Sequence, residues 1–121
     1  MIYDYSISSE TKFVHIIANG NYSIKDIKKL VEIIISDERY KPDFNSIIDI
    51  RKVNYTPVVS EILEISDFII TMKNSFKAKV ALLVNGELHY KLFKLSANRS
   101  KKSGINFDIF TDLEKTKNWI G

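Results

Sequence analysis

Alternating and periodic hydrophobic positions divide the first third of the chain into two strands and a helix. Residues 2–7 (IYDYSI) alternate apolar and polar side chains and predict a strand, and residues 12–18 (KFVHIIA) predict a second one. The short polar link between these strands favours an antiparallel hairpin. Ser23 is placed to cap a helix over 24–38, with Asp26 as the third helical residue, where a carboxylate stabilises the helix N-terminus.

The middle of the chain continues with strands and helices in alternation. Residues 46–51 (SIIDIR) are largely apolar and predict a strand that is buried on both faces. Thr56 is expected to cap the next helix, with Pro57 at the first helical position, where its missing N–H costs nothing. We expect this helix to run to about Asn74, and residues 78–84 (AKVALLV) predict the strand that follows.

The last third of the chain repeats the pattern. A third helix is expected over 87–102, and its core stripe is expected to consist of the leucines Leu88, Leu92 and Leu95. Residues 106–110 (NFDIF) alternate again and predict a strand. Thr111 is expected to cap a short last helix through Trp119, with Glu114 completing a capping box.

The predicted element order is β-β-α-β-α-β-α-β-α, which is an α/β fold within a single domain over 1–121. An N-terminal hairpin is followed by alternating helices and strands. Helical connections of this length imply a mostly parallel sheet with right-handed crossovers. Hydrophobic periodicity does not determine the order of the strands within the sheet.

Three stretches carry a resemblance to a known family. They are IIDIRKV at 47–53, KVALLVN at 79–85 and the ending FDIFTDLEKTKNWI at 107–120. Together with the element order, they resemble the STAS superfamily and are most similar to its SpoIIAA-like branch of small stand-alone bacterial proteins. The ending is similar to that family's strand, Asp-containing turn and short helix closing in Trp and an aliphatic residue, although Thr116 stands where the family usually has alanine.

The resemblance implies a non-enzymatic regulatory or protein-interaction module. In anti-anti-sigma members of the superfamily, a buried strand ending in Asp is followed by a loop and an Asp-Ser pair, whose serine a partner kinase phosphorylates. With the strand-end aspartate aligned on Asp49, that pair falls on Pro57 and Val58, which carry no hydroxyl. Thr56 and Ser60 are the nearest hydroxyl groups. The phosphorylatable serine is therefore expected to be missing.

Candidate binding residues lie at the end of the predicted third strand, in the segment that follows it, and directly after the predicted fourth strand. Asp49 and Arg51 are two residues apart, so their side chains point to the same side of a strand and could form an ion pair. Ligands of open α/β folds bind at the carboxyl edge of the sheet. The predicted binding residues for a partner or ligand are Asp49, Arg51, Tyr55, Thr56, Ser60 and Asn85. The alternative is that they serve structure, as an ion pair, turn residues and a helix cap.

Composition and motifs exclude several functional classes. The chain has no cysteine, which excludes disulfides, a thiolate nucleophile and a cysteine zinc site. His15 and His89 are the two histidines, and no phosphate loop, serine elbow or zinc-protease motif is present. We therefore expect no enzymatic activity, no metal and no cofactor. The start of the chain has no secretory signal pattern, and a cytoplasmic location is expected.

The net charge of +3 conceals an uneven distribution. Residues 1–72 carry 8 basic and 11 acidic groups, whereas residues 73–104 carry 8 basic groups and one acidic group. The predicted basic surface consists of Lys91, Lys94, Arg99, Lys101 and Lys102. Such a surface can meet an acidic partner or lie on an anionic membrane, so membrane contact is at most peripheral. A nucleic-acid partner is not expected, because residues 1–72 are net acidic.

Two functions and one assembly state remain open. The first function is a STAS-type module that binds a protein partner around Tyr55–Ser60 and the second helix. The alternative is a small-molecule or lipid-binding domain with an apolar pocket under the second helix, which is rich in isoleucine. The same excess of apolar side chains could serve a homodimer.

Overall fold

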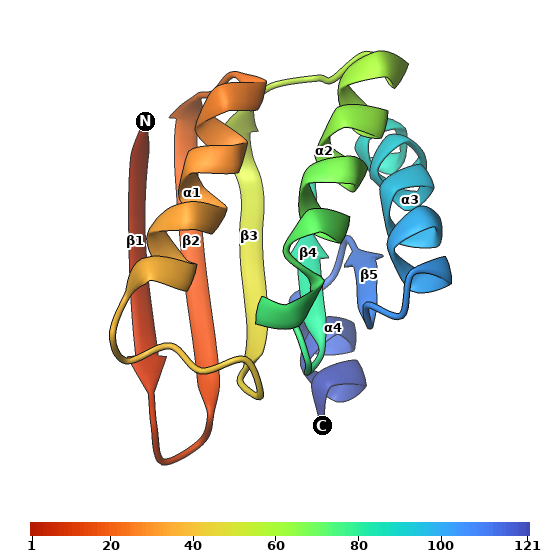
Figure 1. Ribbon diagram of the computed structural model, residues 1–121. Helices are drawn as coiled ribbons and strands as arrows, with labels where there is room; N and C mark the ends of the chain where they lie inside the picture. Colours follow the sequence, from red (N-terminus) through yellow and green to blue (C-terminus); the bar gives the residue numbers. More distant parts are fainter.

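The structure is a computed structural model that describes residues 1–121 and contains a five-stranded sheet with helices on both faces (Figure 1). The strands are β1 (Ile2–Ser8), β2 (Phe13–Asn21), β3 (Asn45–Asn54), β4 (Val80–Leu83) and β5 (Phe107–Phe110). The helices are α1 (Ile24–Ser36), α2 (Val59–Thr71), α3 (Glu87–Lys102), α4 (Leu113–Ile120) and the 3-10 turn η1 (Lys73–Ser75).

The strands lie in the sheet in the same order as in the chain, β1-β2-β3-β4-β5. The pair β1 and β2 is antiparallel, and every other pair is parallel. The predicted order of elements and the predicted hairpin are confirmed. Successive right-handed crossovers that all step in one direction place α1, α2 and α3 on the same face, whereas α4 packs on the other face (Figure 1).

Helix α1 begins where its capping residues predict. The Ser23 hydroxyl accepts a hydrogen bond from the Asp26 N–H, and the Asp26 carboxylate accepts one from the Ser23 N–H, which forms a capping box. The helix ends at Ser36, two residues before the predicted end. Local sequence is decisive here because both capping partners lie within one helical turn.

The predicted start of α2 is wrong. The helix begins at Val59, so its N-cap residue is Val58 and not Thr56. The Glu61 carboxylate accepts from the Val58 N–H at 3.1 Å and satisfies one of the free donors at the helix start. Thr56 lies outside the helix because its hydroxyl contacts another element, as described below. The helix ends at Thr71, and η1 continues the helical stretch to Ser75.

The predicted cap of α4 is displaced by one residue. Asp112, and not Thr111, caps the helix through a carboxylate that accepts from the N–H groups of Glu114 and Lys115. Glu114 is consequently the second helical residue and makes no capping box. A carboxylate next to a free helix terminus competes well against a hydroxyl, because it also neutralises the positive end of the helix dipole.

The predicted core stripe of α3 is also wrong. Leu88 is 62% exposed and Leu95 is 44% exposed, whereas Leu92 is only partly buried. The buried face of the helix consists instead of Phe93, Ser96, Ala97 and Ser100. Small residues on that face let α3 approach the sheet and α2 closely. The leucines are thereby turned toward solvent.

The main core lies between the sheet and helices α1 to α3. A smaller group, Ile47, Ala81 and Leu83, is fully buried on the α4 face of the sheet. Beyond α4 this face is open, and Ile17 on β2 is 45% exposed. None of the helices has the length and apolar character that crossing a membrane requires.

Candidate functional site

A surface pocket lies on the α4 face of the sheet, toward the carboxyl ends of β2, β3 and β4. Its volume is about 420 Å³, and its lining residues are Ile17, Ala18, Asp49, Arg51, Lys52 and Asn85. We call it the edge pocket. The fold thus brings together three of the predicted binding residues, Asp49, Arg51 and Asn85. Lys52, which also lines it, escaped the sequence prediction because an exposed lysine at a strand end carries no distinctive signal.

A bulge in β3 positions the polar groups of the edge pocket. Ile17 pairs with Asp49 but Asn19 pairs with Lys52, so β3 contains one more residue than β2 at this point. The Asp49 carboxylate accepts from the Arg51 backbone N–H at 3.0 Å, next to this irregularity. The Asp49 carboxylate therefore takes the place of the backbone carbonyl that would accept from this N–H in a regular sheet, and it stabilises the bulge.

Asp49 and Arg51 form the ion pair that their spacing predicts. Two guanidinium nitrogens of Arg51 contact the carboxylate, the closest at 2.8 Å. Burial alone would raise the pKa of Asp49, but the hydrogen bonds from the Arg51 side chain and backbone outweigh burial and lower it. The side-chain hydrogen bonds to Asp49, together with its charge, raise the pKa of Arg51. Asp49 is therefore a charged structural group at neutral pH and is not suited to act as a general acid.

The β3–α2 loop is tied to the start of α3 by a histidine. The His89 ring contacts the Thr56 hydroxyl through Nε2 at 3.0 Å and the Asn85 carbonyl through Nδ1 at 3.0 Å. Since a carbonyl only accepts, Nδ1 carries the proton, and Thr56 donates to the neutral Nε2 or accepts from a charged ring. His89 thus fixes the loop at the carboxyl edge. The sequence prediction missed this role because the two residues are distant in the chain.

The remaining predicted residues, Tyr55 and Ser60, flank that loop. The Tyr55 hydroxyl is buried without a hydrogen-bond partner, and burial, with Glu61 nearby, raises the pKa of Tyr55. Ser60 is exposed at the second position of α2. Between them, Val58 and Val59 are 59% and 54% exposed. Two adjacent large apolar side chains therefore project at the start of α2, where the loop held by the Thr56–His89 contact ends.

His15 lies on the open face of the sheet, where the charge of Asp49 influences its pKa. Its Nε2 atom is buried without a hydrogen-bond partner. Burial lowers the pKa of His15, although the charge of Asp49 opposes that effect. Residues that could ligate a metal form no group of three or more. His15 is therefore a neutral, half-buried side chain of β2 at neutral pH.

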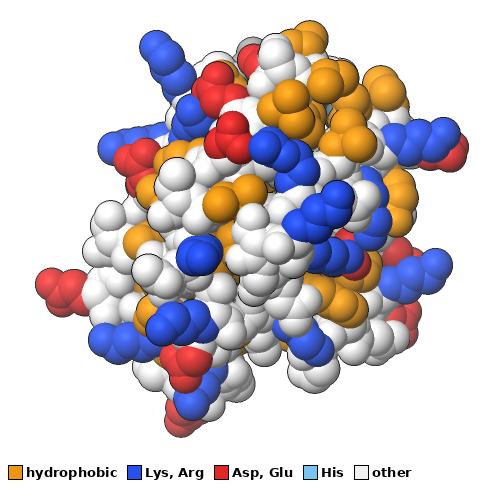
Figure 2. Space-filling model, turned by 45° about the vertical axis from the view of Figure 1, so that its right-hand side comes forward, with side chains coloured by type: hydrophobic (Ala, Val, Ile, Leu, Met, Phe, Trp, Pro, Cys, Tyr) orange, Lys and Arg blue, Asp and Glu red, His pale blue; other side chains and the backbone are white.

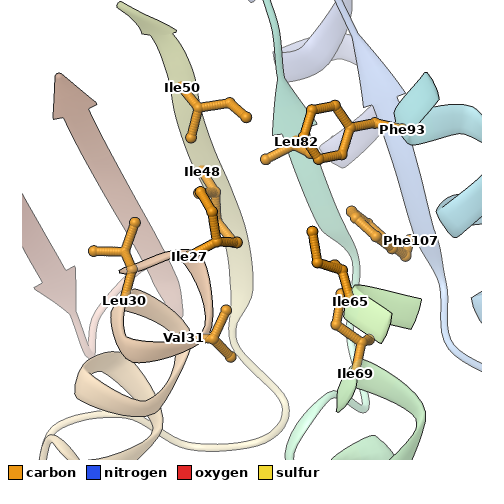
Figure 3. A pocket seen from close by; sticks show the side chains of 10 residues that line it. All are labelled: Ile27, Leu30, Val31, Ile48, Ile50, Ile65, Ile69, Leu82, Phe93 and Phe107. Carbon is orange, nitrogen blue, oxygen red and sulfur yellow. The ribbon is translucent and has the colours of Figure 1, made fainter. Parts of the chain in front are cut away.

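An apolar cleft separates α1 from α2 above β3 (Figure 3). Ile27 and Val31 of α1 face Ile65 and Ile69 of α2 across it, and its floor comes from the sheet. All ten lining residues are hydrophobic, and the enclosed volume is about 40 Å³. That volume accommodates one or two water-sized groups, so the cleft is narrow.

An ion pair joins the two helices beside the cleft. Lys28 of α1 contacts Glu64 of α2, and its Nζ also lies 5.7 Å from the centre of the Phe68 ring. Lys28 and Glu64 are the sequence neighbours of the cleft residues Ile27 and Ile65. These contacts hold α1 and α2 together at the surface, where the apolar contacts between the helices are sparse.

Most of the predicted basic surface is engaged in ion pairs. Lys94 and Lys101 both contact Asp108 of β5, and the hydrogen bonds to these lysines help lower the pKa of Asp108 against its burial. Arg99 pairs with Asp67 of α2, and Lys91 pairs with Glu87. The positive charge of this segment therefore serves in large part to hold α3 against its neighbours.

Comparison with known proteins identifies the fold. No family model and no curated protein matches the chain. Among solved structures, the chain is similar to an uncharacterized DUF3478-family protein with a SpoIIAA-like fold from Shewanella loihica PV-4. The TM-score is 0.61 at 17% identity, and the match covers 99% of this chain and 93% of the other. The chain therefore has a SpoIIAA-like fold.

Proposed function

Starting from the SpoIIAA-like fold, we propose that the protein is a non-enzymatic regulatory module that binds a protein partner at the carboxyl edge of its sheet, around Tyr55–Ser60 and the start of α2. The observation that carries this proposal is the pair of exposed valines, Val58 and Val59, at the start of α2, next to a loop that the Thr56–His89 contact holds in place. Exposed apolar side chains on a rigid support bind partners with little ordering cost.

The proposed module works without a phosphorylation switch at the family position. Pro57 and Val58 stand at that position and have no hydroxyl to accept a phosphate. Binding would instead depend on apolar contact through Val58 and on the polar groups beside it. The edge pocket, with Arg51, Lys52 and Asn85, would meet polar or acidic groups of the partner.

The partner surface can be tested with a change that leaves the fold intact. We expect Val58→Gln to weaken capture of the partner from a lysate of the native host by about tenfold, because one central apolar contact is worth roughly 1–2 kcal/mol. The matched control is Ile2→Gln, which changes an exposed apolar residue on the edge strand β1, away from both the loop and the edge pocket. Quantitative mass spectrometry of the captured proteins measures the effect. Equal capture by both variants would contradict the proposed surface.

A second candidate function is binding of a small apolar ligand, which the entirely hydrophobic cleft between α1 and α2 supports. The cleft encloses about 40 Å³, so anything larger than a few heavy atoms requires the helices to separate. The contact of Lys28 with Glu64 would have to break in that opening. A bound lipid would therefore compete with the surface contacts that close the cleft.

Native mass spectrometry of the purified protein tests the ligand candidate. A ligand that copurifies should be lost from Val31→Ile, because the added methyl group fills part of the cleft. The same change should raise the free energy of unfolding by about 1 kcal/mol, since it removes empty space from the core. Wild-type protein without any bound mass would contradict this function.

A further inference from the structure

The exposed leucines of α3 join two residues of α2 in one apolar surface. We call it the leucine patch and define it by Val59, Leu63, Leu88, Leu92 and Leu95. Leu63 is 43% exposed, and Figure 2 shows hydrophobic side chains gathered at the upper right, over the N-terminal halves of α2 and α3. Four exposed apolar side chains and the partly buried Leu92 lie together on two adjacent helices, unlike the single scattered apolar residues of an ordinary surface.

Charges divide the borders of the patch into an acidic and a basic side. Helix α2 carries three acidic residues, Glu61, Glu64 and Asp67, and no basic one. Helix α3 carries five basic residues and one acidic residue, Glu87. On the outer edge of α3, Lys91 is 71% exposed and Lys102 is exposed as well. Glu64 and Asp67 pair within the chain with Lys28 and Arg99, yet 53% and 66% of their side chains stay exposed. A surface with one acidic and one basic side is therefore still complementary to a second copy of itself.

The direction of the helices selects one symmetric arrangement. Helices α2 and α3 both run back from the carboxyl edge of the sheet and lie side by side (Figure 1). A two-fold axis along the helices places α2 of each copy on α3 of the other, so that acidic and basic sides meet. A two-fold axis across the helices would set α3 against α3 and oppose like charges, which is unfavourable.

We propose that the leucine patch is the interface of a symmetric homodimer in which α2 of each copy packs on α3 of the other. This inference goes beyond the proposed function, whose surface lies at the carboxyl edge of the sheet and shares only Val59 with the leucine patch. Arg99, one turn after Leu95, donates to the Leu63 carbonyl, so Leu63 and Leu95 lie at similar levels of the two helices. In the dimer, Leu63 of one copy therefore faces Leu95 of the other.

Cysteine cross-linking tests this arrangement directly, because the chain has no cysteine of its own. A mixture of Leu63→Cys and Leu95→Cys proteins should form a disulfide dimer under mild oxidation, whereas Leu63→Cys alone should form little. Efficient cross-linking of Leu63→Cys to itself would overturn the proposal, because it would place α2 against α2. A chain that sediments as a monomer at high concentration would overturn it as well.

Substitution within the patch gives an independent measurement. We expect Leu63→Gln and Leu95→Gln each to weaken dimerisation about tenfold in analytical ultracentrifugation, because each removes a central apolar contact. Ile17→Gln is the control, with an exposure of 45% against 43% and 44% for the leucines. Added salt should weaken the wild-type dimer, since unlike charges border the interface.

The outcomes separate this inference from the proposed function. A dimer that is unaffected by both glutamine substitutions would overturn the inference, because its interface would lie elsewhere. A monomeric chain that still captures a partner through Val58 would overturn the dimer and leave the partner surface standing. Conversely, the cross-linked dimer would stand even if Val58→Gln captured the same proteins as the wild type.

Discussion

Replacing Phe93 by alanine should lower the free energy of unfolding by about 3–4 kcal/mol, the usual cost of removing a buried aromatic ring. Phe93 is buried and lines the apolar cleft together with residues of α1, α2 and the sheet. The cleft already contains empty space, so the surroundings would have to collapse further to fill the hole. Urea unfolding, monitored by the fluorescence of Trp119, measures the loss.

The matched control for this prediction is Leu88→Ala in the same helix. Leu88 is largely exposed, and its loss should change the stability of the isolated chain by no more than about 0.5 kcal/mol. Both proteins should be compared at low concentration, so that the proposed dimer does not contribute. If the leucine change cost as much as the phenylalanine change, α3 would have to face the core with its leucines, and the assigned rotation of the helix would be wrong.

Replacing Arg51 by leucine should have the second-largest effect, a loss of about 2 kcal/mol at neutral pH. The change leaves the Asp49 carboxylate buried without its counter-charge. Removing one partner of a fully buried pair typically costs about 3–5 kcal/mol. The expected loss of about 2 kcal/mol lies below that range because the Arg51 side chain is partly exposed to water.

The pH dependence distinguishes this charge effect from a loss of packing. In the wild type the pKa of Asp49 is lowered, so the pair contributes stability above the unfolded-state pKa of about 3.9, and that stability is lost as the pH falls through the folded-state pKa. In Arg51→Leu, burial without the guanidinium should raise the pKa of Asp49 instead. The difference in stability should therefore be full at neutral pH, begin to shrink as the pH falls through the raised pKa of Asp49 in the variant, and vanish below the lowered pKa of Asp49 in the wild type.

A double variant completes the test of the ion pair. Asp49→Asn in the Arg51→Leu background removes the buried charge, while the amide oxygen can still accept from the backbone N–H at position 51. We expect the double variant to recover at least half of the lost stability at neutral pH. Urea unfolding across the acidic range measures all three proteins. A loss that is the same at every pH, with no recovery in the double variant, would contradict a role for charge.

Capping residues show how far local sequence predicts this fold. Ser23 and Asp26 mark the start of α1 correctly, because the side chain of each accepts a hydrogen bond from the backbone N–H of the other. Thr56 fails as a cap of α2 because His89, 33 residues later in the chain, takes its hydroxyl. Thr111 fails because Asp112 provides a stronger acceptor one residue further on. A local rule therefore holds only where no competitor for the same group exists.

In the candidate site, too, local sequence predicts some features and misses others. The spacing of Asp49 and Arg51 predicts their ion pair, because two residues along a strand place side chains on one side. The grouping of these residues with Asn85 follows from the pairing of β3 with β4, which the spacing of residues in the sequence did not determine. The bulge in β3 and the position of Lys52 could not be predicted, because a register shift depends on how neighbouring strands pair.

Helix α3 shows why a hydrophobic pattern alone can mislead. Three leucines at helical spacing have the period of a buried stripe, yet the helix buries Phe93, Ala97 and two serines. The buried face of α3 packs against α2 and β5, where small side chains allow a closer approach than leucines do. The resulting outward stripe is the basis of the proposed dimer. The proposed dimer interface therefore depends on which face of α3 is buried, and hydrophobic periodicity does not predict that face.

The sequence by itself determined the order of strands and helices, the N-terminal hairpin, the mostly parallel sheet and the Asp49–Arg51 pair. All of these depend on contacts between near neighbours or on periods of two and 3.6 residues. The tertiary structure alone decided the strand order, the bulge, the rotation of α3 and the contact of Thr56 with His89. Each of these depends on competition for space or hydrogen bonds between segments far apart in the chain, which the spacing of residues does not record.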